Sequence, residues 1–188
     1  MRLFPELQDS SLVHWLVVDS VRVPDITQLV YQYEKNVELY RLFAGTPFDH
    51  LIEQSPVAFR YSGVTEIERQ LKEDFALRTS SVLFSCDPSV ATESVIQHFQ
   101  ALLYVVVAES PILFRYYASP IWNDVAPETT AEDRCTLLGP CQALSWVDSQ
   151  QNGHSLRQFP EAKIEADFQL PYHLQSPVFN ALVEQRYG

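Results

Sequence analysis

Apolar and polar residues follow two different periods along the chain, and both are typical of a folded domain. Short β-branched and aromatic runs between turn residues predict strands over residues 13–18, 40–48, 56–61, 81–85, 103–107, 112–117 and 142–147. Apolar residues at helical spacing predict helices beginning near Pro24, Thr65, Asp87, Pro120 and Thr130, with a helical turn over 49–53 and a last helix over 177–186. Because strands and helices follow one another irregularly, we expect an α/β fold with a mixed β-sheet flanked by helices.

Three of these helix starts carry a local signal. Thr65 and Glu68 have the spacing of a capping box, and Asp87 precedes a proline that suits the first helical position. Thr130 is expected to cap a helix that ends at Gly139.

The composition indicates a folded protein with an acidic surface. Of 188 residues, 46% are hydrophobic, which argues against disorder despite a net charge of −11. Successive thirds of the chain carry −3, −4 and −4, so no segment looks like a basic arm and nucleic acid is disfavoured as a partner. An evenly charged surface favours solubility, and it leaves open an acidic surface that meets a basic partner.

Cysteine usage and the N-terminal pattern point to a cytoplasmic protein. Cys86, Cys135 and Cys141 cannot all pair, and no CxxC motif is present, so we expect reduced thiols. The acidic residues and the proline near the N-terminus do not fit a signal peptide. The apolar stretch without Asp, Glu, Lys or Arg over residues 94–108 is too short to span a bilayer.

The sequence offers little local chemistry for an enzyme. The five histidines have no metal-ligand spacing, and no glycine pattern fits a phosphate loop. Cys86 lies between a predicted strand and a helix start, where a thiol pKa can be lowered, but a structural role fits it better. We therefore expect no catalytic residue, no metal and no cofactor.

Aromatic residues are the most prominent feature, in an early cluster around Phe43 and Phe48 and a later one around Tyr117 and Trp122. Aromatic residues form cores, and Tyr and Trp are also enriched at protein interfaces. In a strand over 112–117, Phe114 and Tyr116 would lie on the face opposite Arg115 and Tyr117, so one pair should be more exposed.

Several segments, in order, resemble the family of type VI secretion effector chaperones, or VgrG adaptors, which carry a conserved domain of otherwise unknown function. The matching segments are Val17-Val18-Asp19, residues 42–48 (LFAGTPF), Ser55-Pro56-Val57, residues 82–87, residues 114–120 (FRYYASP), residues 137–140 (LLGP) and Trp146. This FRYYASP run departs from the family at one point: Ala118-Ser119 precedes Pro120 where the family usually has Asp before the proline. The resemblance spans about residues 12–148. It implies an adaptor domain over 1–148, with 149–188 as a short extension ending in a helix, a truncated second lobe.

The resemblance implies a non-catalytic bacterial protein that binds a toxic effector in the cytoplasm and helps to load it onto the VgrG spike. Because they lie in or beside the family's motifs, we expect partner-binding residues at Phe43, Phe48, Arg115, Tyr117 and Trp122. Two alternatives remain open: an immunity-type inhibitor that binds a toxin through its acidic surface, and a small hydrolase using Cys86 or an assembled His/Asp site.

Overall fold

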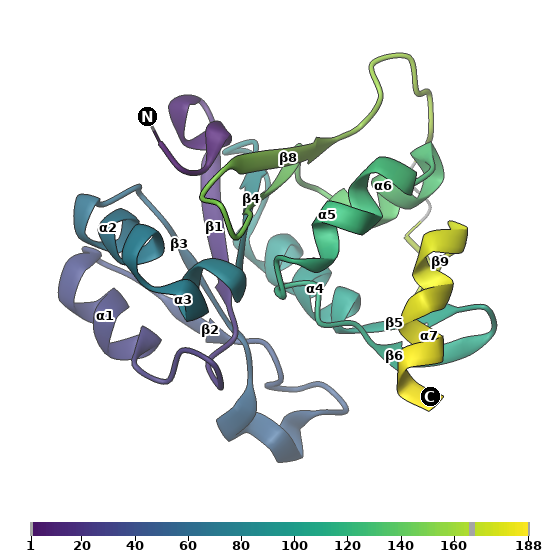
Figure 1. Ribbon diagram of the computed structural model, residues 1–188, viewed down its shortest axis with the longest axis horizontal. Helices are drawn as coiled ribbons and strands as arrows, with labels where there is room; N and C mark the ends of the chain where they lie inside the picture. The colour runs from purple at the N-terminus through teal and green to yellow at the C-terminus, as the bar shows by residue number, and fades with distance from the viewer. Residues whose placement is uncertain (1, 166–167, 188) are drawn as a thin grey trace.

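Two β-sheets organise the protein in the computed structural model, which describes residues 2–165 and 168–187 (Figure 1). The larger sheet has six strands in the order β2-β3-β1-β4-β7-β8, with every neighbouring pair antiparallel. Its strands are β1 (Val13–Val18), β2 (Leu39–Arg41), β3 (Val57–Arg60), β4 (Ser81–Cys86), β7 (Ala143–Val147) and β8 (Gly153–Arg157). The smaller sheet has the order β6-β5-β9, from β5 (Tyr104–Val107), β6 (Ser110–Leu113) and β9 (Tyr172–Leu174). Because β9 runs parallel to β5, the predicted mixed α/β architecture is confirmed.

The helices lie on both faces of the larger sheet (Figure 1). One face is covered by α1 (Ile26–Tyr33), α2 (Thr65–Glu73) and α3 (Phe75–Thr79). The other face packs against α4 (Thr92–Leu103), α5 (Ile121–Val125), α6 (Ala131–Leu138) and the smaller sheet. Four short 3-10 helices, η1 (Pro5–Gln8), η2 (Asp49–Gln54), η3 (Ala126–Glu128) and η4 (Pro177–Phe179), and the final α7 (Asn180–Tyr187) complete the described elements.

Strand β1 shows why the sheet can be covered on both faces. Successive side chains of a strand point to opposite faces. Trp15 and Val17 therefore enter the core beneath α4 and the smaller sheet. Leu16 and Val18 enter the core beneath α1 and α2. The apolar run from Trp15 to Val18 is what a strand buried on both faces requires.

The segment after residue 148 packs against the rest of the fold. β8 extends the larger sheet beside β7, and β9 extends the smaller sheet beside β5. The buried carboxylate of Asp133 accepts hydrogen bonds from the backbone N–H groups of Gln175 (3.1 Å) and Ser176 (2.6 Å) and from the Ser176 hydroxyl. This carboxylate fixes the chain between β9 and η4 to the first turn of α6.

Several local expectations are corrected. The strand expected over 40–48 is limited to Leu39–Arg41, and the strand over 112–117 ends at Leu113. Strands β8 and β9 were not predicted. Thr65 lies inside α2, whose N-cap is Val64, and the N-cap of α4 is Ala91 instead of Asp87. The cap at Thr130 is confirmed, since its hydroxyl accepts a hydrogen bond from the Asp133 N–H at 3.3 Å.

The expectation of reduced thiols is also corrected for one pair. Cys86, the last residue of β4, and Cys141, just before β7, form a disulfide. The antiparallel pairing of these strands brings the two Cα atoms to 4.3 Å, although 55 positions separate them in the sequence. Local spacing could not reveal this pair, because the β4–β7 pairing creates it. Cys135 is a free cysteine.

A candidate partner-binding groove

A groove of about 970 Å³ opens beside the β5–β6 hairpin. Its walls come from this hairpin, from the loop before η2, from α5 and from α7, so it joins segments distant in the sequence. The lining side chains on which the argument depends are Phe48, Tyr104, Leu113, Arg115, Ile121 and Leu182. We call this feature the hairpin groove.

Tyr104 and Leu113 form the most exposed apolar pair of the groove. They are direct partners in the β5–β6 register. The neighbouring pair, Val105 and Ile112, points the other way and is buried in the core. Tyr104 remains 43% exposed and Leu113 41% exposed, which is unusual for large apolar side chains lying side by side. An exposed apolar patch of this kind is typical of an interaction site.

The motif loop before η2 holds Phe48 at the groove. Gly45 has a φ of +70°, a left-handed conformation that glycine adopts without steric cost. The Gly45 N–H donates to the Asp49 carboxylate at 2.8 Å, and the Thr46 hydroxyl donates to the Phe43 carbonyl at 2.7 Å. The tight turn thus brings the Phe48 ring within 5.4 Å of the Phe43 ring, centroid to centroid.

Arg115 supplies a positive charge in the lining. Its Nη2 donates a hydrogen bond to Asp19 Oδ2 at 2.7 Å, and the guanidinium lies 6.0 Å from the centre of the Tyr117 ring. Burial disfavours the charged guanidinium, but the hydrogen bond to Asp19 and nearby negative charge outweigh it, so the pKa of Arg115 is raised. Its side chain is 55% exposed, whereas that of Asp19 is 5% exposed. Arg115 can therefore contact a partner while it is oriented by a buried carboxylate.

The structure separates the five predicted site residues into two sets. Phe48 and Arg115 line the groove. Phe43, Tyr117 and Trp122 are buried, at 4%, 4% and 0% exposure, and the expectation that they are accessible to a partner is corrected. Trp122 contacts the Trp146 and Phe114 rings. Its indole N–H donates to the Tyr116 carbonyl at 2.7 Å, so its one polar group is already satisfied.

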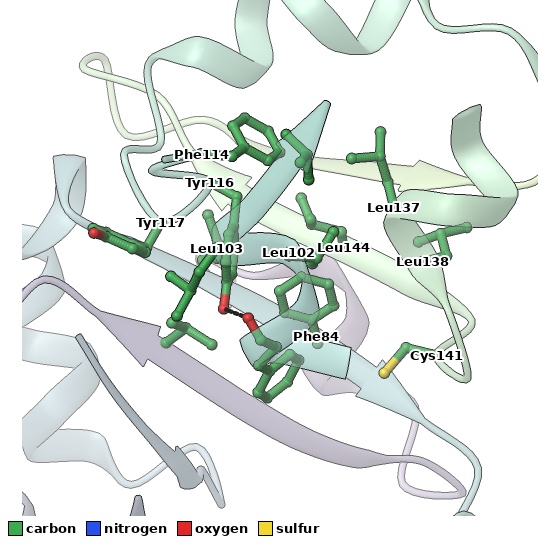
Figure 2. Close-up of a cluster of buried hydrophobic side chains, with 14 of the residues drawn as sticks. Phe84, Leu102, Leu103, Phe114, Tyr116, Tyr117, Leu137, Leu138, Cys141 and Leu144 are labelled. Atoms are coloured by element: carbon green, nitrogen blue, oxygen red, sulfur yellow. Dashed lines mark hydrogen bonds between the residues drawn. The ribbon is translucent and has the colours of Figure 1, made fainter. Parts of the chain in front are cut away.

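The aromatic cluster beneath the groove explains this burial (Figure 2). Residues 116 and 117 lie in a turn after β6, so the expected alternation of faces does not extend to them. The Tyr116 hydroxyl donates to the Phe99 carbonyl at 2.9 Å, and burial raises the pKa of this hydroxyl. Figure 2 shows Tyr117 at the margin of the cluster, with its hydroxyl pointing away from the other labelled rings.

The reactive side chains considered from the sequence have structural partners. In the part of the chain that the structure describes, no group of three His, Cys, Asp or Glu residues could hold a metal ion. The sulfur of Cys86 is bonded to Cys141 and is not a free thiol. His98 is buried between the Leu137 carbonyl, 2.9 Å from Nε2, and the Tyr172 hydroxyl, 3.0 Å from Nδ1.

Sequence reasoning missed Tyr104 and Leu113 as site residues. The predicted hairpin could have indicated them, because the side chains of each strand alternate between the face toward the core and the face away from it. The outward positions of β5 and β6 should then have been polar if they faced only solvent. Instead they hold Tyr104 and Leu113.

The comparison with protein families identifies the class of this chain. Residues 14–136 match the model described as a domain of unknown function, DUF4123, and the chain belongs to that family. The family is known as a type VI secretion effector chaperone or adaptor domain, so the resemblance seen in the motifs is confirmed. Neither the search of curated proteins nor that of solved structures returned a match. Within the described ranges, no helix is long and apolar enough to cross a membrane.

Proposed function

We propose that this protein is a non-catalytic adaptor that binds a type VI secretion effector in the bacterial cytoplasm and helps to load it onto the VgrG spike. The observation that carries the proposal is the paired exposure of Tyr104 and Leu113 in the hairpin groove of a DUF4123 protein. The proposal requires no metal and no cofactor.

The groove suits reversible binding of an apolar effector segment. A large apolar side chain that passes from full exposure to full burial contributes about 1.5–3 kcal/mol, so Tyr104 and Leu113, already more than half buried, would each contribute about half of that or less. Contacts around Tyr104, Leu113 and Phe48 would therefore provide part of a micromolar affinity, which corresponds to about 8 kcal/mol. An adaptor must also release its cargo, so this moderate affinity fits the role.

Arg115 would add orientation more than affinity. A half-exposed guanidinium gains little from an exposed ion pair. It can donate directed hydrogen bonds to carbonyl or carboxylate groups of the bound segment. Its contact with Asp19 restricts its conformations before the partner arrives, which lowers the entropic cost of binding.

Co-purification tests the proposal. The tagged full-length chain is mixed at micromolar concentration with a candidate effector and a candidate VgrG protein, separately and together. Retention of the effector, and of VgrG in its presence, is expected. Retention of neither protein contradicts the adaptor function. Neutralisation of a toxin without any binding to VgrG would instead favour the immunity-type inhibitor.

A further inference from the structure

Strand β2 forms one edge of the larger sheet and presents unpaired backbone groups. The order β2-β3-β1-β4-β7-β8 gives β2 a single neighbour, β3. In this antiparallel register Leu39, Tyr40 and Arg41 face Phe59, Ala58 and Val57. The Leu42 N–H donates to the Pro56 carbonyl at 3.0 Å, which fixes the phase of the ladder. Hydrogen-bonded pairs alternate along such a ladder, so Tyr40 bonds to β3 while Leu39 and Arg41 point their backbone groups outward.

Three backbone groups at this edge have no partner within the described residues: the N–H and carbonyl of Leu39 and the N–H of Arg41. The Arg41 carbonyl already accepts a hydrogen bond from the Ala44 N–H at 3.1 Å. The two N–H donors lie two residues apart, and the carbonyl acceptor belongs to the first of these residues. The backbone of an added strand can therefore form hydrogen bonds with all three groups. An edge of this kind is a template for pairing with another chain.

An acidic hollow of about 400 Å³ lies beside this edge, between β2 and the first turns of α4. Its lining includes Glu38, Tyr40, Glu93 and Ile96, and among the described residues it contains no Lys or Arg. Glu38 and Glu93 are exposed, and the Tyr40 hydroxyl donates to the Glu38 carboxylate. Two carboxylates beside a tyrosine ring and an isoleucine suit the charged end and the apolar stem of a Lys or Arg side chain.

Arg60, a cation on this side of the sheet, is engaged by other groups. Arg60 lines an adjoining hollow that also includes Glu38 and Tyr40, together with Trp15 and Thr92. Its guanidinium lies 5.3 Å from the centre of the Trp15 ring, and its Nη2 donates to the Thr92 hydroxyl at 2.9 Å. Among the described residues, neither Glu38 nor Glu93 forms an ion pair with Arg60 or with another cation, so both carboxylates remain available to a charge from outside. The net charge of −11 favours the approach of a cation.

We propose that the β2 edge binds an extended basic segment of a partner protein by strand addition. The backbone of the segment pairs with Leu39 and Arg41, and one of its Lys or Arg side chains enters the hollow between Glu38 and Glu93. Backbone pairing provides affinity and the side-chain hollow provides specificity, as in other cases of strand addition. This surface shares no lining residue with the hairpin groove, so an adaptor could use both at once.

Peptide binding tests this proposal without an effector or VgrG, so its outcome is separate from that of the proposed function. The probe is a fluorescent seven-residue peptide of alternating Val and Lys, compared with one of alternating Val and Glu. Anisotropy should show saturable binding of the Lys peptide, at least tenfold weaker binding of the Glu peptide, and weakening as salt increases. In an NMR titration, the amide signals of Leu39 and Arg41 should shift, while that of Tyr40 shifts less.

Two matched pairs of variants separate the backbone and side-chain contributions. Arg41→Pro removes the outward N–H without removing a hydrogen bond to β3, and Arg41→Ala is its control, since it loses the same side chain and keeps the N–H. Arg41→Pro should weaken binding at least fivefold relative to Arg41→Ala. Glu93→Gln should weaken it at least threefold, whereas Glu132→Gln, an equal charge change on α6, should not.

Three results would overturn the proposal. The first is no binding of the Lys peptide at millimolar concentration. The second is equal binding of the Lys and Glu peptides. The third is equal affinity of Arg41→Pro and Arg41→Ala when both variants unfold at the same temperature. If Arg41→Pro fails to fold, the NMR titration of the wild-type chain replaces it as the test. Peptide binding without a shift of the Leu39 and Arg41 amide signals would then overturn strand addition.

Discussion

Arg115 Nη2 and Asp19 Oδ2 lie 2.7 Å apart, although 96 positions separate the two residues in the sequence. Asp19 directly follows β1, and Arg115 follows β6 in the smaller sheet. Asp19 Oδ1 also accepts a hydrogen bond from the Val21 N–H at 2.9 Å. One buried carboxylate therefore orders the turn after β1 and joins the two sheets. Both residues belong to segments that carry the family resemblance.

The Asp19–Arg115 pair should contribute modestly to stability, and mostly through Asp19. Asp19→Ala leaves the Val21 N–H without its acceptor, which should cost about 2–3 kcal/mol. Arg115→Ala should cost about 1 kcal/mol or less, because its side chain is largely exposed. Urea unfolding of both single variants and the double variant should give a coupling free energy of about 1 kcal/mol. Strict additivity would show that the ion pair adds nothing to stability.

Changes at Tyr104 and Leu113 should affect binding far more than folding. Serine at either position removes exposed apolar surface, so the free energy of unfolding should change by less than about 1 kcal/mol. Effector binding should weaken about tenfold or more if these residues are central to the interface. Val21→Ser, which alters another exposed apolar side chain outside the groove lining, is the control. Unchanged effector affinity in both groove variants would exclude the hairpin groove as the effector site.

Trp122 should behave as a core residue. Trp122→Ala removes a fully buried ring and leaves the Tyr116 carbonyl without its donor, which should cost about 3–5 kcal/mol. Thermal unfolding measures this loss. Phe75→Ala, at a side chain that is 56% exposed, provides the comparison and should cost about 1 kcal/mol or less. Similar unfolding temperatures for the two variants would contradict the burial of Trp122.

His98 should make the fold sensitive to acid. Burial lowers the pKa of His98 to about 4 from a usual value of 6.5, so the folded protein holds it neutral. Since the Leu137 carbonyl can only accept, Nε2 donates to it and Nδ1 accepts from the Tyr172 hydroxyl. The unfolded chain binds a proton near pH 6.5, whereas the folded chain does so near pH 4. The stabilisation that neutral His98 provides is therefore fully present above pH 6.5. As the pH decreases from 6.5 through 4, the free energy of unfolding falls by roughly 3 kcal/mol.

The stability–pH profile of His98→Gln checks this effect. Glutamine can still donate to Leu137 and accept from Tyr172, but it does not titrate. Between pH 6.5 and 4.5 the slope of unfolding free energy against pH should be smaller in this variant than in the wild type. Gln97→Ala, which changes no titratable group at an exposed position of α4, should keep the wild-type slope. Identical slopes in all three proteins would contradict a buried neutral His98.

The disulfide should be detectable by thiol counting. Under oxidising conditions the denatured chain should react at one thiol, Cys135, and after reduction at three. Closing a loop of this length stabilises a protein by at most about 4 kcal/mol in the chain-entropy account. The reduced protein should therefore unfold at a lower denaturant concentration, yet remain folded, because the β4–β7 ladder does not depend on the bond. In the cytoplasm proposed for this adaptor, thiols are kept reduced, and the reduced form would be the working one.

Sequence patterns predicted the central strands and most helices because those elements carry strong local signals. Val13–Val18 is apolar except for His14, and α6 has both its cap at Thr130 and its end at Gly139. Gly139 has a φ of +56°, and a Cβ there would overlap the His98 ring, so two independent constraints require glycine. Local consistency of this kind makes a prediction dependable.

Features that depend on contacts between segments distant in the chain could not be predicted from the sequence. β9 has only three residues and exists because β5 offers an edge. The Asp87 side chain accepts from the Ser89 N–H at 2.8 Å in a local turn, and this competes with a capping role. Phe48 and Arg115 were found as groove residues through their motifs. The buried positions of Phe43, Tyr117 and Trp122 depend on tertiary packing that neither periodicity nor motif order encodes.

The parallel pairing of β9 with β5 has a consequence for biosynthesis. During translation the β5–β6 hairpin leaves the ribosome more than 50 residues before its third strand, since Val105 pairs with Tyr172. Until β9 arrives, one side of β5 is an unprotected edge, and such edges favour aggregation of nascent chains. Completion of the smaller sheet is then the late, slow event expected of a non-local pairing. The cargo recognition proposed for the hairpin would therefore mature only after the residues of β9 have been synthesised.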